Sequence, residues 1–339
     1  MCYKQVKTFR CPGCSSRLEL IIKTLDGNNN RDAKVKTKTL QCIQCTKVFP
    51  IQNDIPRFVE QNNYAKSFGY QWNKYKQTQL DSISGLSITE NRFFGVTGWD
   101  KTLLDNKILE AGCGAGRFTE IVIKTQAEVY SFDYSNAVDA NFKNNGSNNN
   151  LHIFQADIFS IPIKLNFFDK IFCLGVLQHT PDPEKAFHSL IPYLKPGGEI
   201  CVDVYDLSFR SFFNLKYWFR PITKRMKKEK LYKLVKILVP LLFPIKMFIT
   251  EKIPFGKYFA FFIPIAYHKG FIKEMNAMSY EQLLEWSILD TFDKYAPMYD
   301  KPKTIREVKK WFNDAKLVSP QVHYGPNGIV GKAKKPYIV

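Results

Sequence analysis

The stretch KILEAGCGAGRFTE, residues 107–120, decides the fold class. A short apolar run ends at Glu110, glycines follow at alternate positions, and a segment with helical spacing begins immediately after them. Glycine lets the backbone turn tightly and approach a ligand closely, and the helix that follows presents its N-terminus to the ligand's polar end. The stretch therefore predicts a strand, a helix, and between them a ligand-binding turn that contains Gly112, Gly114 and Gly116.

The residues on both sides of this stretch continue the same alternation. Between residues 107 and 206, short β-branched or aromatic runs alternate with segments whose apolar residues are spaced by three and four. Strands are expected in KILEAG, AEVYSFDY, LHIFQAD, FDKIFCLG and GEICVDVY. Strands that alternate with helices form a parallel sheet. We therefore expect an α/β fold with a doubly wound, Rossmann-like sheet.

Two aspartates follow the second and third of these strands. Asp133 lies in SFDYS, about 20 residues after the glycine turn, and Asp157 lies in QADIFSIP. A carboxylate at the first position can accept hydrogen bonds from both hydroxyls of a ribose, and one at the second can bind an adenine amino group. Together with the turn, the two residues favour a ligand that contains adenosine.

These motifs, in this order, resemble the class I S-adenosylmethionine (SAM)-dependent methyltransferases, especially the small-molecule, methyltransferase type 11-like branch that includes quinone-biosynthesis enzymes. The resemblance covers about residues 100–206, where FDKIFCLGVLQHTPDPEKAFHSLIPYLKPGGEI follows the aspartates, and TIREVKKWFNDAKLV is similar to the family's last helix and strand. It implies a seven-stranded methyltransferase sheet, SAM as the cofactor and methyl transfer as the reaction. The alternate spacing of the glycines also differs from the G-x-G-x-x-G pattern of dinucleotide-binding proteins.

The same resemblance assigns roles to individual residues. It leaves two readings open for Arg117, which either reaches the methionine carboxylate or is an exposed residue of the first helical turn. It implies that the following residues bind SAM: Glu110, Gly112, Gly114 and Gly116 at the methionine moiety, Asp133 at the ribose, Asp157 with Ile158 at the adenine, and Leu174 near the transferred methyl group.

His179 in VLQHTPDP follows the fourth expected strand, where acceptors meet the methyl group in this fold. A hydroxyl acceptor must lose its proton, and a histidine with a pKa near neutrality suits that task. His179 is therefore the candidate catalytic base, although it is equally suited to bracing the loop before the next helix. The (Asp/Asn)-Pro-Pro-aromatic motif of enzymes that methylate base amino groups does not occur after this strand, which favours a small or lipid-like acceptor.

Two CxxC pairs, CPGC and CIQC, mark the N-terminal region. They provide four thiolates that can close a tetrahedral zinc site: Cys11, Cys14, Cys42 and Cys45. The continuation LQCIQCTKVFPIQNDIPRFVE resembles a small zinc-ribbon family whose best-known member activates tRNA, rRNA and protein methyltransferases. We therefore expect a zinc ribbon with structural Zn²⁺, and we expect the remaining cysteines of the core to be small buried residues: Cys113, Cys173 and Cys201.

A basic insert follows the fifth expected strand. The formal net charge is +18, and residues 207–280 hold most of the excess, with 15 Lys and Arg against three Glu. Its apolar run ILVPLLFPI is interrupted by Pro240 and Pro244. Apolar residues facing inward and lysines facing outward predict a helical lid over the acceptor pocket. Peripheral contact with an anionic membrane and a lipid-linked acceptor is a second reading, and RNA contact is a third.

Composition divides the chain into four parts: a zinc ribbon at 1–60, a SAM-binding core with N-terminal helices at 61–206, the insert or lid at 207–286, and a closing helix and strands at 287–339. The opening MCYKQVKTFR has no apolar signal core, and no apolar run approaches the roughly 20 residues of a spanning helix. Spaced cysteines without a signal are typical of a reducing compartment. We expect a cytoplasmic protein, with membrane-peripheral attachment left open.

The expected function is SAM-dependent transfer of a methyl group to an oxygen or carbon atom of a small, lipid-like or saccharide-type metabolite. Two alternatives stay open. One is an rRNA or tRNA methyltransferase that uses the zinc ribbon and the basic insert to bind RNA. The other is a SAM-binding regulatory or partner-docking module.

Overall fold

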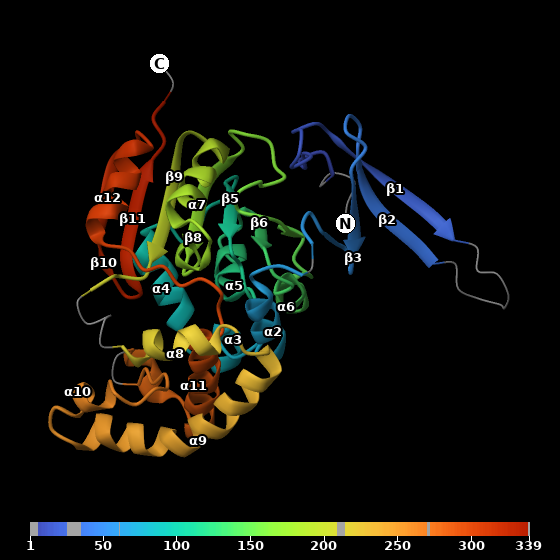
Figure 1. Cartoon of the computed structure of the whole chain (residues 1–339). Coiled ribbons are helices and arrows are strands. Elements are labelled where there is room, and N and C mark those ends of the chain that lie inside the picture. Colours follow the sequence, from blue (N-terminus) through green and yellow to red (C-terminus); the bar gives the residue numbers. More distant parts are fainter. Residues whose placement is uncertain (1–5, 26–34, 61, 209–213, 270–271, 338–339) are drawn as a thin grey trace.

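A computed structural model describes residues 6–25, 35–60, 62–208, 214–269 and 272–337. Figure 1 shows three parts of the molecule: an α/β core in the middle, a β-hairpin region on one side of it, and a group of helices below it.

The core contains one seven-stranded sheet in the order β10-β11-β9-β8-β5-β6-β7. Its strands are β5 Lys107–Ala111, β6 Glu128–Asp133, β7 Leu151–Gln155, β8 Phe168–Leu174, β9 Leu194–Val204, β10 Val318–Gly325 and β11 Gly328–Lys334. The strands from β7 to β9 are parallel, and β11 pairs antiparallel with β9 and β10. The strand order reverses between β5 and β8, where sheets of this kind bind ligands at their carboxyl ends. The predicted seven-stranded, doubly wound Rossmann-like sheet is confirmed.

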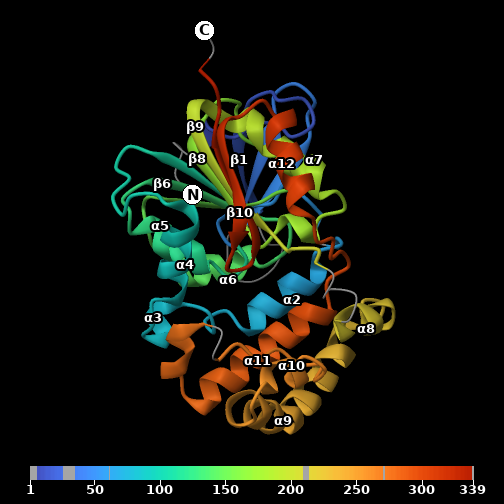
Figure 2. The same cartoon turned by 90° about the vertical axis from the view of Figure 1, so that its left-hand side faces the viewer.

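Helices cover both faces of the sheet, as Figure 2 shows for α5 on one side and α12 on the other. The first face carries α4 Ile88–Thr97, α5 Arg117–Ile123 and α6 Val138–Asn145, and the second carries α7 Pro183–Leu190 and α12 Ile305–Asp314. Successive strand side chains point to opposite faces. Ile108 accordingly belongs to the apolar cluster of α5, and Leu109 belongs to the cluster of α7 and α12.

The N-terminal region forms its own antiparallel sheet from β1 Leu18–Leu25, β2 Val35–Cys42, β3 Val48–Gln52 and β4 Ile55–Pro56. It docks on β7, the edge strand of the core. The amide of Phe58 donates to the carbonyl of Gln155 at 2.9 Å, and the rings of Phe9 and Phe58 pack against Phe154. An edge strand presents unpaired backbone groups, so this contact protects one side of the sheet.

The lid consists of α8 Leu215–Thr223, α9 Lys228–Lys252, α10 Gly256–Ala260, the 3₁₀ helix η4 Lys273–Ala277 and α11 Tyr280–Tyr295. Between lid and sheet lie α2 Lys66–Lys74 and α3 Asp81–Ser84 (Figure 2). The lid has a hydrophobic cluster of its own, which joins Phe243 of α9 to Trp286 of α11. The boundary expected at residue 286 falls inside α11. None of the helices in the described segments is both long and apolar enough to cross a membrane.

Helix α9 departs from the expectation for the insert. The helix continues through Pro240 and Pro244, although each proline removes one backbone hydrogen bond. The expected division into apolar residues inside and lysines outside is wrong in part, because Lys246 is buried while Ile237 and Leu241 are 61% and 63% exposed. One stripe of α9 follows the expectation and is buried: Leu231, Val235, Val239 and Phe243.

Candidate active site

The turn between β5 and α5 requires its glycines. Gly112, Gly114 and Gly116 have φ values of +83°, +52° and +88°, a region that side chains disfavour. A Cβ atom on Gly112 would lie 2.3 Å from a methyl carbon of Val176, and one on Gly114 would lie 3.2 Å from Nε1 of Trp72. The turn is therefore closed on one side by the loop after β8 and lies on another side against α2.

Glu110 ends β5 and braces the turn from inside the core. Its Oε2 accepts hydrogen bonds from Ser131 Oγ at 2.6 Å and from the hydroxyl of Thr119. Burial raises the pKa of Glu110 to about 7, and the two hydroxyl donors oppose that rise. Its Oε1 has no hydrogen-bond partner among the described residues, so one buried acceptor is left for a ligand or a water molecule.

Asp133 at the end of β6 is fixed by three hydrogen bonds. Its Oδ2 accepts from the amide of Gly114 at 3.0 Å, and its Oδ1 accepts from the amide and the hydroxyl of Ser135 at 2.8 and 2.7 Å. Burial raises the pKa of Asp133, and these donors lower it. A carboxylate held in this way still has lone pairs for the hydroxyl groups of a ligand.

A cavity of about 1400 Å³ opens at the carboxyl ends of β5, β6 and β8. Its core side is formed by the glycine turn and by the ends of these strands, and its opposite side by residues of α2, α9, α10 and α11. Among the described residues, none before Tyr64 lines it. The core and the lid therefore enclose one common space, and the N-terminal region stays outside it.

The predicted SAM-binding residues divide into two groups around this cavity. Asp157 is not part of the lining; its Oδ1 accepts from the amide of Phe159 at 3.0 Å and holds the turn after β7. Burial raises the pKa of Asp157. The residues that line the cavity are Gly112, Gly114, Asp133, Ile158 and Leu174, and those that do not are Glu110, Gly116 and Asp157.

His179 lines the cavity and also braces the chain behind it. Its Nδ1–H donates to the carbonyl of Tyr299 at 3.0 Å, and its ring packs edge-on against Phe68 and Tyr205. The residue is only 7% exposed, and burial lowers its pKa to about 4. His179 is therefore neutral near pH 7 and a weak proton acceptor. These contacts are those of a residue that braces the loop, and the position of His179 in the lining leaves its catalytic role a prediction.

A chain of polar contacts leads from the glycine turn to the lid. Arg117, in the first turn of α5, donates to Oε1 of Gln79 at 2.7 Å, and Nε2 of Gln79 donates to Asp290 of α11 at 3.2 Å. The other oxygen of Asp290 accepts from Nε1 of Trp286 at 2.9 Å and lies 2.8 Å from Nε2 of His268. All five side chains line the cavity. Arg117 is half-buried and also donates to Oγ1 of Thr89 at 3.2 Å, so it is not the exposed residue of the second reading, and burial lowers its pKa to about 9.

The lid brings further charged groups to the cavity. Burial, with a smaller contribution from the charge of Asp290, raises the pKa of Asp293 to about 7. Burial lowers the pKa of Lys246 to about 7, and its Nζ donates to the carbonyls of Ile263 and Ile265 at 3.0 and 2.6 Å. Lys216 of α8 forms an ion pair with Asp300 in which both side chains are at most 9% exposed. The lid side of the cavity is thus polar and charged.

Sequence reasoning missed His268 and Gln79. Neither lies in a recognisable motif, and each acquires its place only because α11 packs against α2 and the loop after α10. The sequence does contain one signal, the acidic segment around Asp290 and Asp293, but it does not identify a partner for either carboxylate.

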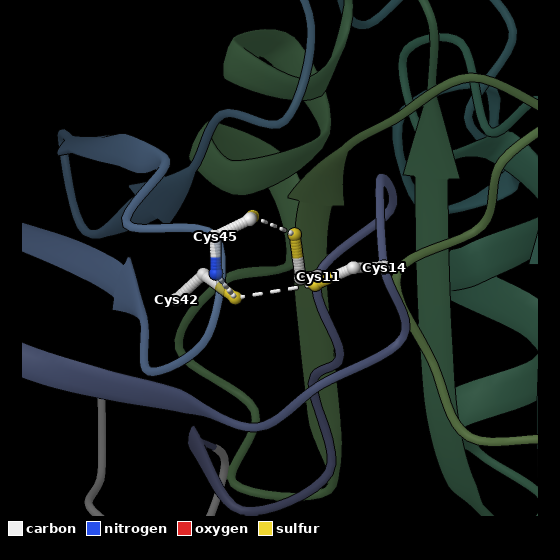
Figure 3. Close-up of side chains that lie close together, drawn as sticks. All are labelled: Cys11, Cys14, Cys42 and Cys45. Atoms are coloured by element: carbon white, nitrogen blue, oxygen red, sulfur yellow. Dashed lines mark hydrogen bonds between the residues drawn. The ribbon is translucent and has the colours of Figure 1, made fainter.

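The four cysteines of the CxxC pairs converge (Figure 3). Sγ of Cys11 lies 3.5 Å from Sγ of Cys45, and Sγ of Cys14 lies 3.4 Å from Sγ of Cys42. All four sulfur atoms lie within 4.8 Å of one another. The arrangement is compatible with metal binding and therefore with the expected ribbon. The other core cysteines are buried, as expected: Cys113, Cys173 and Cys201.

Comparisons with known proteins cover the core. Residues 109–202 match the family model described as "Methyltransferase domain". The chain is 30% identical over 113 residues to the ubiquinone biosynthesis O-methyltransferase of Coxiella burnetii. This alignment covers 33% of this chain and 48% of that protein. It is 34% identical over 104 residues to the tRNA U34 carboxymethyltransferase of Nautilia profundicola, which covers 30% of this chain and 35% of that protein.

A solved structure of a SAM-dependent methyltransferase from Methanosarcina mazei aligns with a TM-score of 0.42 and 14% identity over 70% of this chain and 96% of that one. The chain spans about half, or less, of the length of the curated relatives named above. The sheet order, the glycine turn with Asp133 beside it, and the family match agree over the same residues. Residues 109–202 therefore form a methyltransferase domain of the SAM-dependent type.

Proposed function

We propose that this protein is a methyltransferase that transfers a methyl group from SAM to an oxygen or carbon atom of a small, lipid-like or saccharide-type metabolite. The observation that carries the proposal is the common cavity, which has the glycine turn on one side and charged lid residues on the other. Bound SAM would supply an electrophilic methyl group, and the protein would supply alignment. Alignment of two reacting groups can lower a barrier by about 7–11 kcal/mol at most.

The cofactor half of the cavity would be built from residues already fixed in place. Asp133 would accept hydrogen bonds from the ribose hydroxyls. Gly112 and Gly114 would let the methionine end lie close to the backbone, and a side chain at either position would press on Val176 or Trp72 in the wall of the cavity. Ile158 and Leu174 would pack against the apolar parts of the ligand.

For a hydroxyl acceptor, we assign the base to His268 in preference to His179. A hydrogen bond from Nε2–H of His268 to Asp290 leaves Nδ1 as the proton acceptor and fixes the orientation of the ring. His179 is buried, and its lowered pKa makes it a weaker base. His179 would instead position the loop after β8, beside the reacting atoms, through its hydrogen bond to Tyr299.

The N-terminal cysteines would hold a structural zinc ion. Four thiolates are the donor set that Zn²⁺ prefers in closed sites, and a tetrahedral ion with bonds of about 2.3 Å holds its sulfur ligands about 4 Å apart. Two of the observed sulfur separations, 3.4 and 3.5 Å, are shorter than this, and all four sulfur atoms lie within 4.8 Å of one another. A site with four protein ligands has no open position for chemistry, so the zinc would stabilise the ribbon.

The experiment that tests the function is incubation of the protein with SAM labelled on its methyl group, followed by separation of a cell extract into metabolite, lipid and RNA fractions. Label in the metabolite or lipid fraction supports the proposal. Label in RNA supports the alternative that the tRNA-modifying relatives raise. SAM binding without label in any fraction supports a regulatory or docking module. A cytoplasmic location remains part of the proposal.

A further inference from the structure

The outer side of α9 and α10 carries an apolar surface that the proposed reaction does not use. Six side chains of α9 follow one side of the helix at spacings of mainly three and four, and each is at least 40% exposed: Leu234, Ile237, Leu238, Leu241, Ile245 and Phe248. The next segment adds four aromatic side chains that are 79, 66, 63 and 59% exposed: Phe255, Tyr258, Phe259 and Phe262. We call these ten residues the lid surface.

The α9 residues of the lid surface lie next to one another. Positions three and four apart share one face of a helix, so the six residues of α9 form a continuous stripe. The largest apolar patch on a soluble monomer is commonly about 300–600 Å² and is often functional. The inner stripe of α9, which ends at Phe243, is already buried in the lid cluster. Helix α9 therefore has two apolar faces, and the described part of the chain covers one of them.

The charges beside the stripe indicate which partner it fits. Residues 224–257 contain ten Lys and Arg and two Glu. Lys230, Lys233, Lys236 and Lys252 are exposed on α9. Basic side chains next to aliphatic and aromatic ones suit the interface of an anionic bilayer, where lysines meet the headgroups and apolar side chains enter the acyl boundary. An RNA backbone would use the lysines but would leave the apolar stripe exposed.

The lid surface also reaches the rim of the cavity. Tyr258 and Phe262 line the cavity and are at the same time 66% and 59% exposed. Figure 1 shows α9 and α10 along the edge of the molecule that is farthest from the sheet. A flat membrane could therefore meet this edge without touching the core, and the cavity would open beside it.

We propose that the lid surface binds the interface of an anionic membrane and holds the mouth of the cavity against it. The binding itself stands on the lid alone. We also propose a use for this binding, which rests on the proposed function. An amphiphilic acceptor would enter the cavity from the membrane, with its polar group toward the charged lid residues.

Vesicle co-sedimentation of the full chain tests the proposal. The vesicles are phosphatidylcholine alone and an equimolar mixture of phosphatidylcholine and phosphatidylglycerol. The basic variant is Lys233→Gln with Lys236→Gln, the apolar variant is Ile237→Gln with Leu241→Gln, and the matched control is Arg306→Gln with Lys309→Gln on α12. Each of these positions is exposed, so the fold should be preserved.

We expect the wild type to bind the mixed vesicles and to bind phosphatidylcholine weakly. One lysine near an anionic surface contributes about fivefold to the partition coefficient, so the basic variant should bind roughly 25-fold more weakly. The apolar variant should bind the mixed vesicles at least about tenfold more weakly, because two aliphatic side chains that would enter the bilayer become polar. The control should bind like the wild type.

Three results would overturn the proposal. The first is wild-type protein that stays in solution with both kinds of vesicle, including the case in which it binds RNA instead. The second is an apolar variant that binds like the wild type. The third is a stable dimer, seen by analytical ultracentrifugation, that the apolar variant dissociates, since the lid surface would then belong to a second copy.

Calorimetric titration of the same proteins with S-adenosylhomocysteine separates this proposal from the proposed function. Variants that lose vesicle binding but still bind S-adenosylhomocysteine have an intact cavity, and this result supports the role of the lid surface. A wild type that binds vesicles but not S-adenosylhomocysteine would leave the membrane proposal standing and would contradict the methyltransferase activity.

Discussion

The N-terminal ribbon and the lid are attached to the same sheet, and they contribute different things to it. The ribbon shares a hydrophobic cluster with the face of the core that carries α7 and α12, and buried Arg57 donates to Asp139 and Gln155 at 2.6 and 3.1 Å. None of its described residues lines the cavity. The lid has a separate hydrophobic cluster, and it supplies one side of the cavity.

The ribbon is therefore packed as part of the core, whereas the lid is packed separately and forms one side of the cavity. An element that merges with the core loses stability together with it, whereas an element with its own cluster can open by itself. We therefore expect changes in the ribbon to lower the stability of the whole chain without altering ligand binding. Changes in the lid should alter turnover first.

The largest expected effect is loss of the zinc ligands. Cys42→Ser should abolish stoichiometric zinc and reduce the free energy of unfolding by several kcal/mol, because metal binding contributes directly to the folding of such sites. The affinity for S-adenosylhomocysteine of the folded fraction should stay within about threefold of the wild type, since ribbon and cavity share no lining residue.

Metal analysis and thermal unfolding measure this effect, and Cys201→Ala is the matched control because it removes a buried thiol of the core. The control should retain its zinc. Unchanged zinc content in Cys42→Ser would remove the basis for a metal site in the ribbon.

The next effect concerns the base in the lid. His268→Gln should lower kcat by about 10²- to 10⁴-fold for a hydroxyl acceptor, the usual contribution of general base catalysis. Binding of S-adenosylhomocysteine should not change. His179→Gln should lower kcat less and should also reduce stability, because it disturbs the hydrogen bond to Tyr299.

Single-turnover rates over a range of pH provide the measurement. The Asp290→Asn variant should also lower kcat, since a neutral amide holds the ring of His268 less firmly than a carboxylate does. If His179→Gln proved to be the more damaging substitution, the base would have to be reassigned to the core side of the cavity.

A smaller effect, on stability, is expected from the ion pair that connects α8 with the segment after α11. Lys216→Met leaves the carboxylate of Asp300 buried, with Nε of Arg220 at 3.7 Å as its remaining cation. Removal of one partner of a buried pair costs about 3–5 kcal/mol, and Arg220 should keep this value near the lower end.

Lys310→Met on α12 is the matched control, because its pair with Asp314 is exposed and such pairs contribute at most about 1 kcal/mol. Chemical denaturation, followed by a lid tryptophan such as Trp286, measures both variants. Equal stability of the two would show that the pair in the lid is not effectively buried.

The smallest effect is a pH dependence of stability from Asp293. Burial raises the pKa of this carboxyl from 3.8 to about 7, so the folded state favours its neutral form. This contribution is fully present below about pH 4 and is lost as the pH rises to about 7. We expect the free energy of unfolding to fall across that range, with Glu110 acting in the same direction.

Thermal midpoints measured at intervals from pH 4 to pH 7 test this expectation. The Asp293→Asn variant should show a shallower dependence, whereas Asp314→Asn, on the exposed surface of α12, should keep the wild-type slope. A slope that Asp293→Asn leaves unchanged would assign the titration to other groups.

The core could be predicted from the sequence because its signals are local. Strands that alternate with helices, glycines in a left-handed turn and an aspartate at a strand end each depend on a few consecutive residues. Asp133 was expected to face a ligand, and it lines the cavity. Asp157 carries the same kind of signal, yet it does not line the cavity, an outcome that the sequence does not reveal.

The lid could be predicted only in outline, because its details depend on contacts between distant segments. Lys246 is buried because the loop after α10 presents the carbonyls of Ile263 and Ile265 to its ammonium group. His268 meets Asp290 only after α11 has packed against the rest of the lid. The exposed stripe of α9 is apolar like the buried one, so helical spacing alone could not show which face is covered.

The central claim is that the cavity binds SAM through the glycine turn and Asp133. Calorimetric titration with S-adenosylhomocysteine tests it most directly, with Asp133→Ala and Asp157→Ala as the variants. Hydrogen bonds to a charged group contribute about 1.5–3 kcal/mol, so Asp133→Ala should bind at least about tenfold more weakly than the wild type. Asp157→Ala should be affected less. A wild type that does not bind, or a folded Asp133→Ala that binds as tightly as the wild type, would contradict the claim.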